Sequence, residues 1–348
     1  MNNEPRIYKN GNLWQKKVYK KMADYLCSIP EIKTFGKSIN GNVYKHLLTL
    51  EQSRFNFITE DIYRLTKDRF NHHKAGDLNR VLTNTAASQP YCFNLIIYLQ
   101  LHLALADRLF SNLLNKKVKI HHIEPEFTPN QCTIPGFEQT EDESIGDQKG
   151  KIGTDSDIAV FYSYGNRKKG VLLIEFKFIE SEFSTCTSYS EKEKIKSICD
   201  SGNFYTGLVN PIFEGKTDKT QCGYTKYKNW HLTNESSGMD TQILKGLNAC
   251  PFRFGLNQLW RNMLLSKQVA KARHCNEFGF WVFSPKGNDA FLWKNGVTEK
   301  LFREILTEKG QKQFKIIHLE TILDNLQNII SDQDKLWFND LEKRYRIT

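Results

Sequence analysis

The sequence predicts an α/β protein in which a mixed sheet is flanked by helices. Runs of β-branched, aromatic and large apolar residues have the composition of buried strands. Four such runs are present: Val118 to Phe127, Ile158 to Tyr162, Val171 to Ile174 and Phe278 to Phe283. A long apolar segment from Tyr91 to Leu114, which is predicted to form one buried helix, precedes the first run. Apolar residues at helical spacing from Leu256 to Ala272 predict a second helix before the last run. The predicted order of elements is therefore α-β-β-β-α-β.

The second and third runs are predicted to form a hairpin, because residues 163–170 between them are rich in turn-forming types. Asp157 opens the second strand, and Glu175-Phe176-Lys177 ends the third. Side chains alternate between the two faces of a strand, so Glu175 and Lys177 point the same way while Phe176 returns to the core. The hairpin can therefore place Asp157 beside Glu175.

A buried strand that ends in charged residues requires partners for those charges. Two carboxylates about 4 Å apart repel each other by roughly 4 kcal/mol at an effective dielectric of 20, so Asp157 and Glu175 need a cation between them. Oxygen ligands without nearby His or Cys favour Mg²⁺, with Mn²⁺ as a substitute. Such an ion acidifies a bound water and binds phosphodiester oxygens. Lys177 would orient that water or stabilise the transition state.

Asp157, Glu175 and Lys177, with the hydrophobic strands that carry them, resemble the active site of the PD-(D/E)XK nuclease superfamily, which includes many restriction endonucleases. Ser156 stands where a proline is usual before the Asp. The resemblance covers residues 88–290 and implies a restriction-endonuclease-like core. Finer similarity to a group of poorly characterised bacterial restriction endonucleases rests on short motifs: Ser88-Gln89 with Phe93-Asn94, Gln258 to Asn262, and Ser284-Pro285 with Asn288.

The helix that follows the Glu-x-Lys strand is expected to contribute further groups. Gln258, Arg261 and Asn262 are spaced i, i+3 and i+4 and so share one helical face. In many superfamily members a Gln on this helix supports the site, and the resemblance gives that role to Gln258. Arg261 on the same face is a candidate nucleic-acid contact.

Two further acidic residues are candidates for a third metal ligand. Glu126 lies near the end of the strand before Asp157, and Glu51 lies in the early helical region where superfamily members often add an acidic residue. For both, an ordinary surface carboxylate is the alternative. Asp155 is a possible substitute for Asp157, which is preferred because it adjoins the apolar run directly. Glu180 is expected at the surface.

Basic residues are concentrated near the N-terminus. The chain of 348 residues has 49 Lys and Arg against 39 Asp and Glu, and residues 1–85 hold 15 basic and 8 acidic residues. Such a balance suits a polyanion such as DNA, although a solvated basic surface has the same composition. Four lysines spaced i and i+4 are predicted to form a strip along one helix: Lys16, Lys17, Lys20 and Lys21.

Three regions are predicted: a mostly helical basic region at 1–85, the nuclease core at 86–298 and a mostly helical region at 299–348. The core includes a Cys-containing insert at about 180–254 and an acidic, Gly- and Pro-containing segment at 128–153 that is expected to be a solvated loop.

Cysteine usage and hydropathy favour a cytoplasmic protein with reduced thiols. Neither an apolar signal segment nor a membrane span is visible, and eight cysteines occur. Four of them lie in the insert: Cys186, Cys199, Cys222 and Cys250. A structural Zn²⁺ could join these four, but the absence of a close Cys-x-x-Cys pair favours independent thiols.

The sequence therefore predicts a Mg²⁺-dependent DNA endonuclease of a restriction or phage-defence system. One alternative is a nuclease of the same fold that acts on branched DNA or RNA, because fold does not fix substrate. Another is a non-catalytic nucleic-acid-binding protein, which the retained pair of like charges argues against. Besides DNA, the partners considered are a second copy of the chain, a methyltransferase and a defence-system subunit.

Overall fold

The computed structural model describes residues 4–73, 77–145, 154–191, 193–214, 229–235 and 238–347. A five-stranded mixed sheet in the order β1-β2-β3-β4-β5 lies at the centre of the fold. β2 runs antiparallel to both β1 and β3, whereas β4 pairs parallel with both β3 and β5. The strands are β1 (Val118–Phe127), β2 (Ser156–Tyr164), β3 (Lys168–Phe176), β4 (Glu277–Ser284) and β5 (Phe314–His318).

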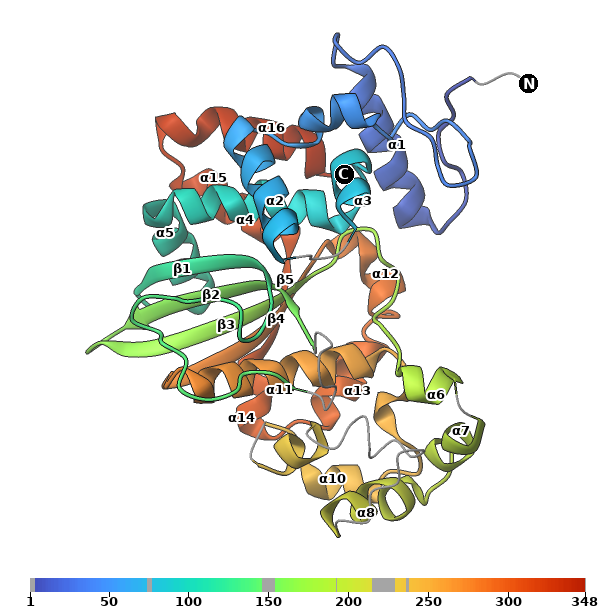
Figure 1. The fold of residues 1–348 in the computed structure, drawn as a ribbon, viewed down its shortest axis with the longest axis vertical. Helices are drawn as coiled ribbons and strands as arrows, with labels where there is room; N and C mark the ends of the chain where they lie inside the picture. The colour runs from blue at the N-terminus through green and yellow to red at the C-terminus, as the bar shows by residue number, and fades with distance from the viewer. Residues whose placement is uncertain are drawn as a thin grey trace.

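One face of the sheet is covered by helices from both ends of the chain (Figure 1). Alternate residues of the central strands, such as Ile158 and Val160, face this layer and share its hydrophobic core. The layer contains α1 (Leu13–Cys27), η1 (Leu50–Asn56), α2 (Glu60–His73), α3 (Leu78–Thr83), α4 (Ser88–Leu101), α5 (Leu103–Leu114), α15 (Leu319–Ile329), η5 (Asp332–Asp334) and α16 (Lys335–Tyr345).

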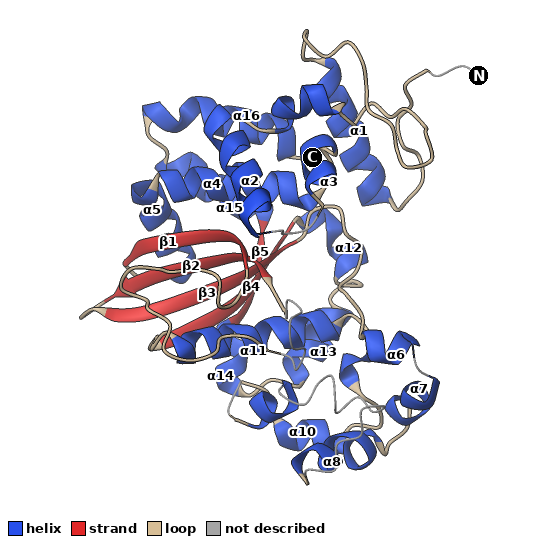
Figure 2. Ribbon diagram, viewed as in Figure 1, coloured by secondary structure: helices blue, strands red, loops and turns tan. Residues whose placement is uncertain are grey.

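The opposite face, to which Ala159 and Phe161 point, packs against a second core (Figure 2). α11 (Leu256–Ala272) lies along β3 and β4 in this layer. The other helices on this side are α6 (Thr187–Glu191), α7 (Glu193–Cys199), the π-helical turn η2 (Tyr205–Val209), α8 (Asn210–Phe213), α10 (Thr241–Gly246), η3 (Pro251–Arg253), α12 (Asp289–Leu292), α13 (Val297–Glu304) and α14 (Glu308–Gln313). The short turn η4 (Lys286–Asn288) links β4 to α12.

The α/β class, the four predicted strands, the hairpin and the helix at 256–272 are confirmed. The single helix expected from Tyr91 to Leu114 is wrong, since His102 (φ −121°, ψ 63°) separates α4 from α5. Its ring stacks on Tyr98 with centroids 4.0 Å apart. No Gly or Pro marks this break in the sequence. No helix among the described residues is long and apolar enough to cross a membrane.

The segment after β1 is not the fully solvated loop that its acidic composition predicts. Glu143 is completely buried and forms an ion pair with Arg273, which follows α11. The Arg273 guanidinium also donates to the carbonyl oxygens of Phe137 (2.8 Å) and Cys132 (2.9 Å). The pair therefore holds this segment against the C-terminal end of α11.

Removing one member of this pair should strongly destabilise the fold. Glu143→Ala leaves the Arg273 charge buried without its partner, so we expect the free energy of unfolding to fall by about 3 kcal/mol. Glu141→Ala is a matched control, because Glu141 and Lys271 join the same two segments by an exposed ion pair of 3.5 Å. Urea denaturation should show a loss below about 1 kcal/mol for that control. Equal losses for the two variants would contradict the structural role of Glu143.

Candidate active site

The predicted acidic and basic residues meet where β2 begins and β3 ends. The last paired residues of this hairpin are Ile158 and Ile174, so Asp157 and Glu175 are the next pair along the register. The Asp157 Oδ2 atom accepts a hydrogen bond of 2.7 Å from the backbone N–H of Phe176. Beyond the end of β3, the Lys177 N–H donates to the Phe283 carbonyl (2.8 Å), so β4 continues to position the backbone at Lys177.

Both carboxylate oxygens of Glu175 are held by side chains. The Lys177 Nζ atom lies 2.7 Å from Glu175 Oε1, and Gln258 Nε2 donates to the same oxygen at 2.7 Å. Asn262 Nδ2 donates to Glu175 Oε2 at 2.6 Å. Gln258 and Asn262 are one turn apart on α11, as their spacing predicts, but the contact of Asn262 with Glu175 was not anticipated. Glu175 is only 4% exposed, so these contacts fix its orientation.

Glu126 approaches the same site from β1 with an unusual backbone conformation. Its φ of +49° is in the left-handed region, which is uncommon for a non-glycine residue. The Arg69 guanidinium donates to the Glu126 carbonyl and forms an ion pair of 2.6 Å with Glu124. Gln89 Nε2, on α4, donates to the Glu126 carboxylate at 2.8 Å. These contacts hold the carboxylate at the strand end.

Burial and mutual repulsion raise the pKa values of the carboxylates at this site. Burial raises the pKa of Asp157 well above its usual value, and the nearby Glu175 and Glu126 raise it further. Burial also raises the pKa of Glu126 to about 7, against the Gln89 hydrogen bond. Burial alone would lower the pKa of Lys177, but Glu175, Glu180 and Asp157 outweigh it and raise that pKa. Lys177 therefore stays protonated at neutral pH.

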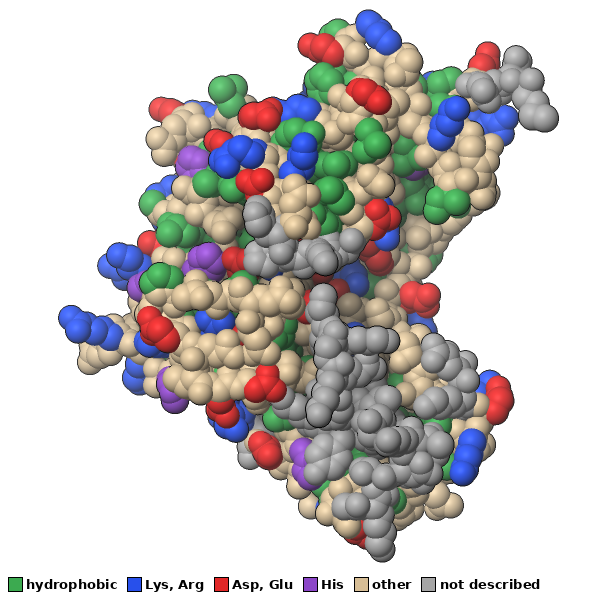
Figure 3. Space-filling model, viewed as in Figure 1, with side chains coloured by type: hydrophobic (Ala, Val, Ile, Leu, Met, Phe, Trp, Pro, Cys, Tyr) green, Lys and Arg blue, Asp and Glu red, His purple; other side chains and the backbone are tan. Residues whose placement is uncertain are grey.

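These residues line a cleft of 280 Å³. Figure 3 shows the molecule narrowing between its two helical layers, with acidic and basic side chains exposed where it narrows. Asp157, Glu175, Lys177, Gln258 and Glu126 all contribute to the cleft lining. The structure thus brings together five of the site residues that the sequence singled out.

Several cleft residues were not predicted as site residues, among them the polar or charged Arg80, Ser88, Gln89 and Glu180. The expectation that Glu180 is a surface group is wrong. Its carboxylate accepts hydrogen bonds from the Ser88 hydroxyl and from the Phe178 N–H (3.1 Å), which ties the first turn of α4 to the segment after Lys177. Ser88-Gln89 was noted only as part of a family-like motif, because nothing local shows that this turn faces the strand ends.

The donor set fits a hard divalent cation. Asp157 and Glu175 offer carboxylate oxygens, and neither His nor a free thiolate stands between them. Among the residues that the structure describes, no group of three or more His, Cys, Asp or Glu side chains could hold a metal ion. Mg²⁺ keeps several waters and is usually bound through one or two carboxylates, so a two-carboxylate site is compatible with it. Glu126 lines the same cleft without completing such a group.

Other predicted residues do not line the cleft. Glu51 and Asp155 are exposed and do not line it. Arg261 is half-buried on α11, and its Nε atom has no hydrogen-bond partner in the described structure. Lys16, Lys17 and Lys20 are exposed on α1, and Lys21 is half-buried there. Three of the cysteines considered for zinc, Cys186, Cys199 and Cys250, are buried, while Cys222 lies outside the described residues.

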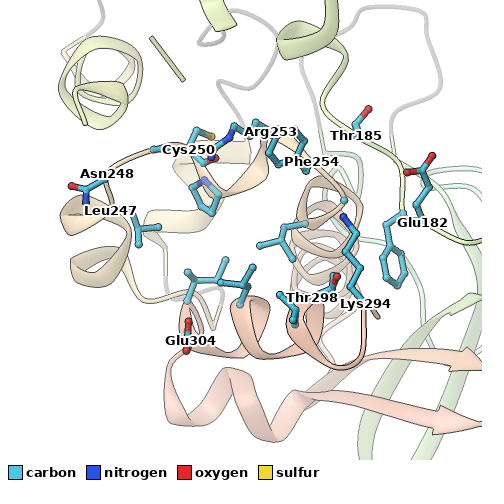
Figure 4. Close-up of a pocket in the computed structure, with 18 of the residues that line it drawn as sticks. Glu182, Thr185, Leu247, Asn248, Cys250, Arg253, Phe254, Lys294, Thr298 and Glu304 are labelled. Atoms are coloured by element: carbon cyan, nitrogen blue, oxygen red, sulfur yellow. The ribbon is translucent and has the colours of Figure 1, made fainter. Parts of the chain in front are cut away.

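A larger cavity of 480 Å³ lies apart from the acidic cleft. Figure 4 shows Thr298 and Glu304 on α13 facing Leu247 and Cys250 across this space. Most of its lining is apolar, and it lacks the facing carboxylates and buried lysine of the cleft. The cleft at the strand ends is therefore the better candidate for hydrolytic chemistry.

A mixed sheet between two helical layers, with buried carboxylates and a lysine where its strands end, is compatible with a restriction-endonuclease-like fold. The chain belongs to the family described as Restriction Endonuclease associating with ARP, whose model matches residues 28–346. Comparisons with curated proteins and with solved structures gave no match. Membership of this family supports a nuclease role for the chain.

Proposed function

We propose that this protein is a Mg²⁺-dependent DNA endonuclease of the PD-(D/E)XK type, acting in restriction or phage defence. The observation that carries the proposal is the position of Asp157 opposite Glu175, with Lys177 bonded to the latter, in one cleft at the strand ends. Membership of a restriction-endonuclease family supports the nuclease part. DNA as the substrate, the metal and each residue's role belong to the proposal.

Asp157 and Glu175 would hold the ion. When bound, Mg²⁺ supplies a more acidic water and a positive charge beside the phosphodiester oxygens. Lys177 would place its ammonium next to the attacked phosphate, where negative charge accumulates in the transition state. Gln258 and Asn262 donate hydrogen bonds to the two Glu175 carboxylate oxygens, so they would keep that carboxylate in place during the reaction.

Metal dependence tests the proposal directly. Plasmid DNA should be cut with Mg²⁺ or Mn²⁺ and remain uncut with EDTA, because the donor set is oxygen-only and the two carboxylates repel each other without a cation. Ca²⁺ should support binding better than cleavage, since its looser coordination positions the reactants less strictly. Gel electrophoresis followed by sequencing of the cut ends measures the reaction. Full cleavage in EDTA would refute the metal mechanism, and cleavage of RNA or branched DNA alone would favour the alternative substrates.

Partners remain proposals too. The family description states an association with ARP, so we include a protein partner in the proposed defence role. A homodimer and a partner methyltransferase stay predictions. Size-exclusion chromatography with light scattering tests for the homodimer. Co-purification of a methyltransferase with this chain from the cells that produce it tests for that partner.

The lysines of α1 are proposed to contact DNA phosphates. Changing Lys16, Lys17, Lys20 and Lys21 together to Ala should weaken binding to all sequences about equally, because phosphate contacts carry no base information. Each lost contact should lower the slope of log affinity against log salt by about 0.9. Lys20 already pairs with Asp24 at 2.6 Å, so we expect the variant to lose about three phosphate contacts rather than four. The slope should fall by the amount that corresponds to three contacts.

A matched control removes the same amount of positive charge from the opposite layer. Four exposed lysines suit it: Lys271, Lys300, Lys309 and Lys312. Fluorescence anisotropy at several salt concentrations should give the control the wild-type slope. Identical slopes for the α1 variant and wild type would show that DNA is held elsewhere on the protein.

A further inference from the structure

A cluster of four aromatic side chains lies in the N-terminal region. Tyr8, Tyr19, Tyr44 and His46 contact one another, with ring centroids from 4.6 Å (Tyr19 and His46) to 6.4 Å (Tyr8 and His46) apart. The three Tyr side chains are half-buried, whereas His46 is only 4% exposed. The His46 ring is therefore buried beneath three Tyr rings that still reach the surface, unlike the rings of a closed hydrophobic core.

The backbone around this aromatic cluster is well fixed. The Arg6 N–H donates to the Val43 carbonyl (3.0 Å), and the Lys45 N–H donates to the Arg6 carbonyl (2.9 Å). The Tyr44 N–H donates to the Gly36 carbonyl at 3.1 Å, and a Cβ at Gly36 would lie 2.3 Å from the Leu48 carbonyl oxygen. Three separate segments are therefore tied together to present these rings.

The aromatic cluster adjoins the acidic cleft through α1. Trp14 and Gln15 on this helix donate to the carbonyl oxygens of Phe178 (2.6 Å) and Ile179 (3.2 Å), directly after Lys177. Burial and then Tyr8 raise the pKa of Tyr19. Two cleft residues also act on that pKa: Arg80 lowers it and Glu180 raises it. Tyr19 therefore lies within electrostatic reach of the cleft lining.

Basic residues flank the rings in the sequence, while the rings themselves are neutral. Burial lowers the pKa of His46 to about 4, so this imidazole is uncharged at neutral pH. Its Nδ1 atom has no hydrogen-bond partner in the described structure. Cations alternate with the rings along the chain and along α1: Arg6 and Lys9 around Tyr8, Lys16 and Lys20 around Tyr19, and Lys45 between Tyr44 and His46.

Neutral rings set among cations are the combination that binds single-stranded nucleic acid, where the rings stack on bases and the cations contact the backbone. Duplex DNA keeps its bases stacked on one another, so a stacking surface contributes only where a base is unpaired or extruded. We propose that the aromatic cluster stacks an unpaired base of the nucleic acid whose backbone enters the cleft. This inference rests on the proposed function and names its substrate class, DNA with an unpaired base near the site of cleavage.

Binding measured in EDTA tests this inference without any need for cleavage. The probes are a labelled duplex with a single-stranded overhang of about ten thymidines, and a blunt duplex of equal length. Tyr8→Leu and Tyr44→Leu should each weaken binding of the overhang probe about tenfold, because one stacking ring is lost. Tyr8→Phe and Tyr44→Phe keep the ring and should bind like wild type. All four variants should bind the blunt probe like wild type.

The Phe variants separate stacking from a structural role of the cluster. Equal affinities of the Leu and Phe variants for the overhang probe would overturn the inference. Equal losses of affinity of the Leu variants for the overhang and blunt probes would also overturn it, and so would a wild-type protein that binds neither probe. Tyr8 lies in the segment before α1, so Tyr8→Leu serves if Tyr44→Leu does not fold. Ring-dependent binding without Mg²⁺-dependent cleavage would support the stacking site while removing the nuclease. Mg²⁺-dependent cleavage together with binding that does not depend on the rings would support the nuclease and contradict the stacking site.

Discussion

Glu175→Gln is expected to reduce DNA cleavage on the order of 10⁴-fold, the scale seen when one member of an interdependent catalytic set is removed. The side chain keeps its size but loses the negative charge that faces Asp157 and Lys177. Without that charge the cleft offers one carboxylate fewer to a divalent cation. Turnover on plasmid DNA at saturating Mg²⁺ measures the effect.

The fold should tolerate this change. The new amide can still accept from Lys177 or Gln258, and its NH₂ group can donate to the Asn262 Oδ1 atom, which has no partner in the described structure. DNA binding in EDTA should therefore stay close to wild type. Glu182→Gln is the matched control, because Glu182 is an exposed acidic residue just beyond the cleft segment. Turnover of Glu175→Gln within about tenfold of wild type would remove Glu175 from the proposed chemistry.

The parts of the site that follow from local pattern were predictable from sequence. β1 has the limits expected from its run of residues, Val118 to Phe127. The hairpin register follows from two apolar runs and a short turn, and it alone places Asp157 opposite Glu175. Gln258 and Asn262 share a face because helical spacing requires it. In each of these cases the information lies within one element or two neighbours in sequence.

The parts that depend on distant packing were not predictable. Glu180 meets Ser88 across 92 residues, and Glu143 meets Arg273 across 130. Composition alone made both acidic residues look solvated, because most carboxylates are exposed. Only the docking of α4 and of the segment after β1 against the sheet supplies their partners. The aromatic cluster was missed for the same reason, since three separated segments build it.

Lys177→Met is expected to lower cleavage by about 10³- to 10⁴-fold. The substitution keeps an unbranched side chain in the buried position but removes the only ammonium bonded to Glu175 among the described contacts. If Lys177 supplies positive charge to the phosphate in the transition state, no other group bonded to Glu175 replaces it, because Gln258 and Asn262 are neutral. Initial rates over a range of Mg²⁺ concentrations measure the loss.

Gln258→Ala separates this role from simple positioning of Glu175. Gln258 and Lys177 both donate to Glu175 Oε1 at 2.7 Å, so each helps to orient that carboxylate. If Lys177 acted only by orientation, the two variants would lose similar amounts of activity, near the tenfold expected from one hydrogen bond to a charged group. If, as proposed, the ammonium also stabilises charge on the reacting phosphate, Lys177→Met should be slower than Gln258→Ala by about 100-fold. Similar rates for the two variants would reduce Lys177 to a positioning residue.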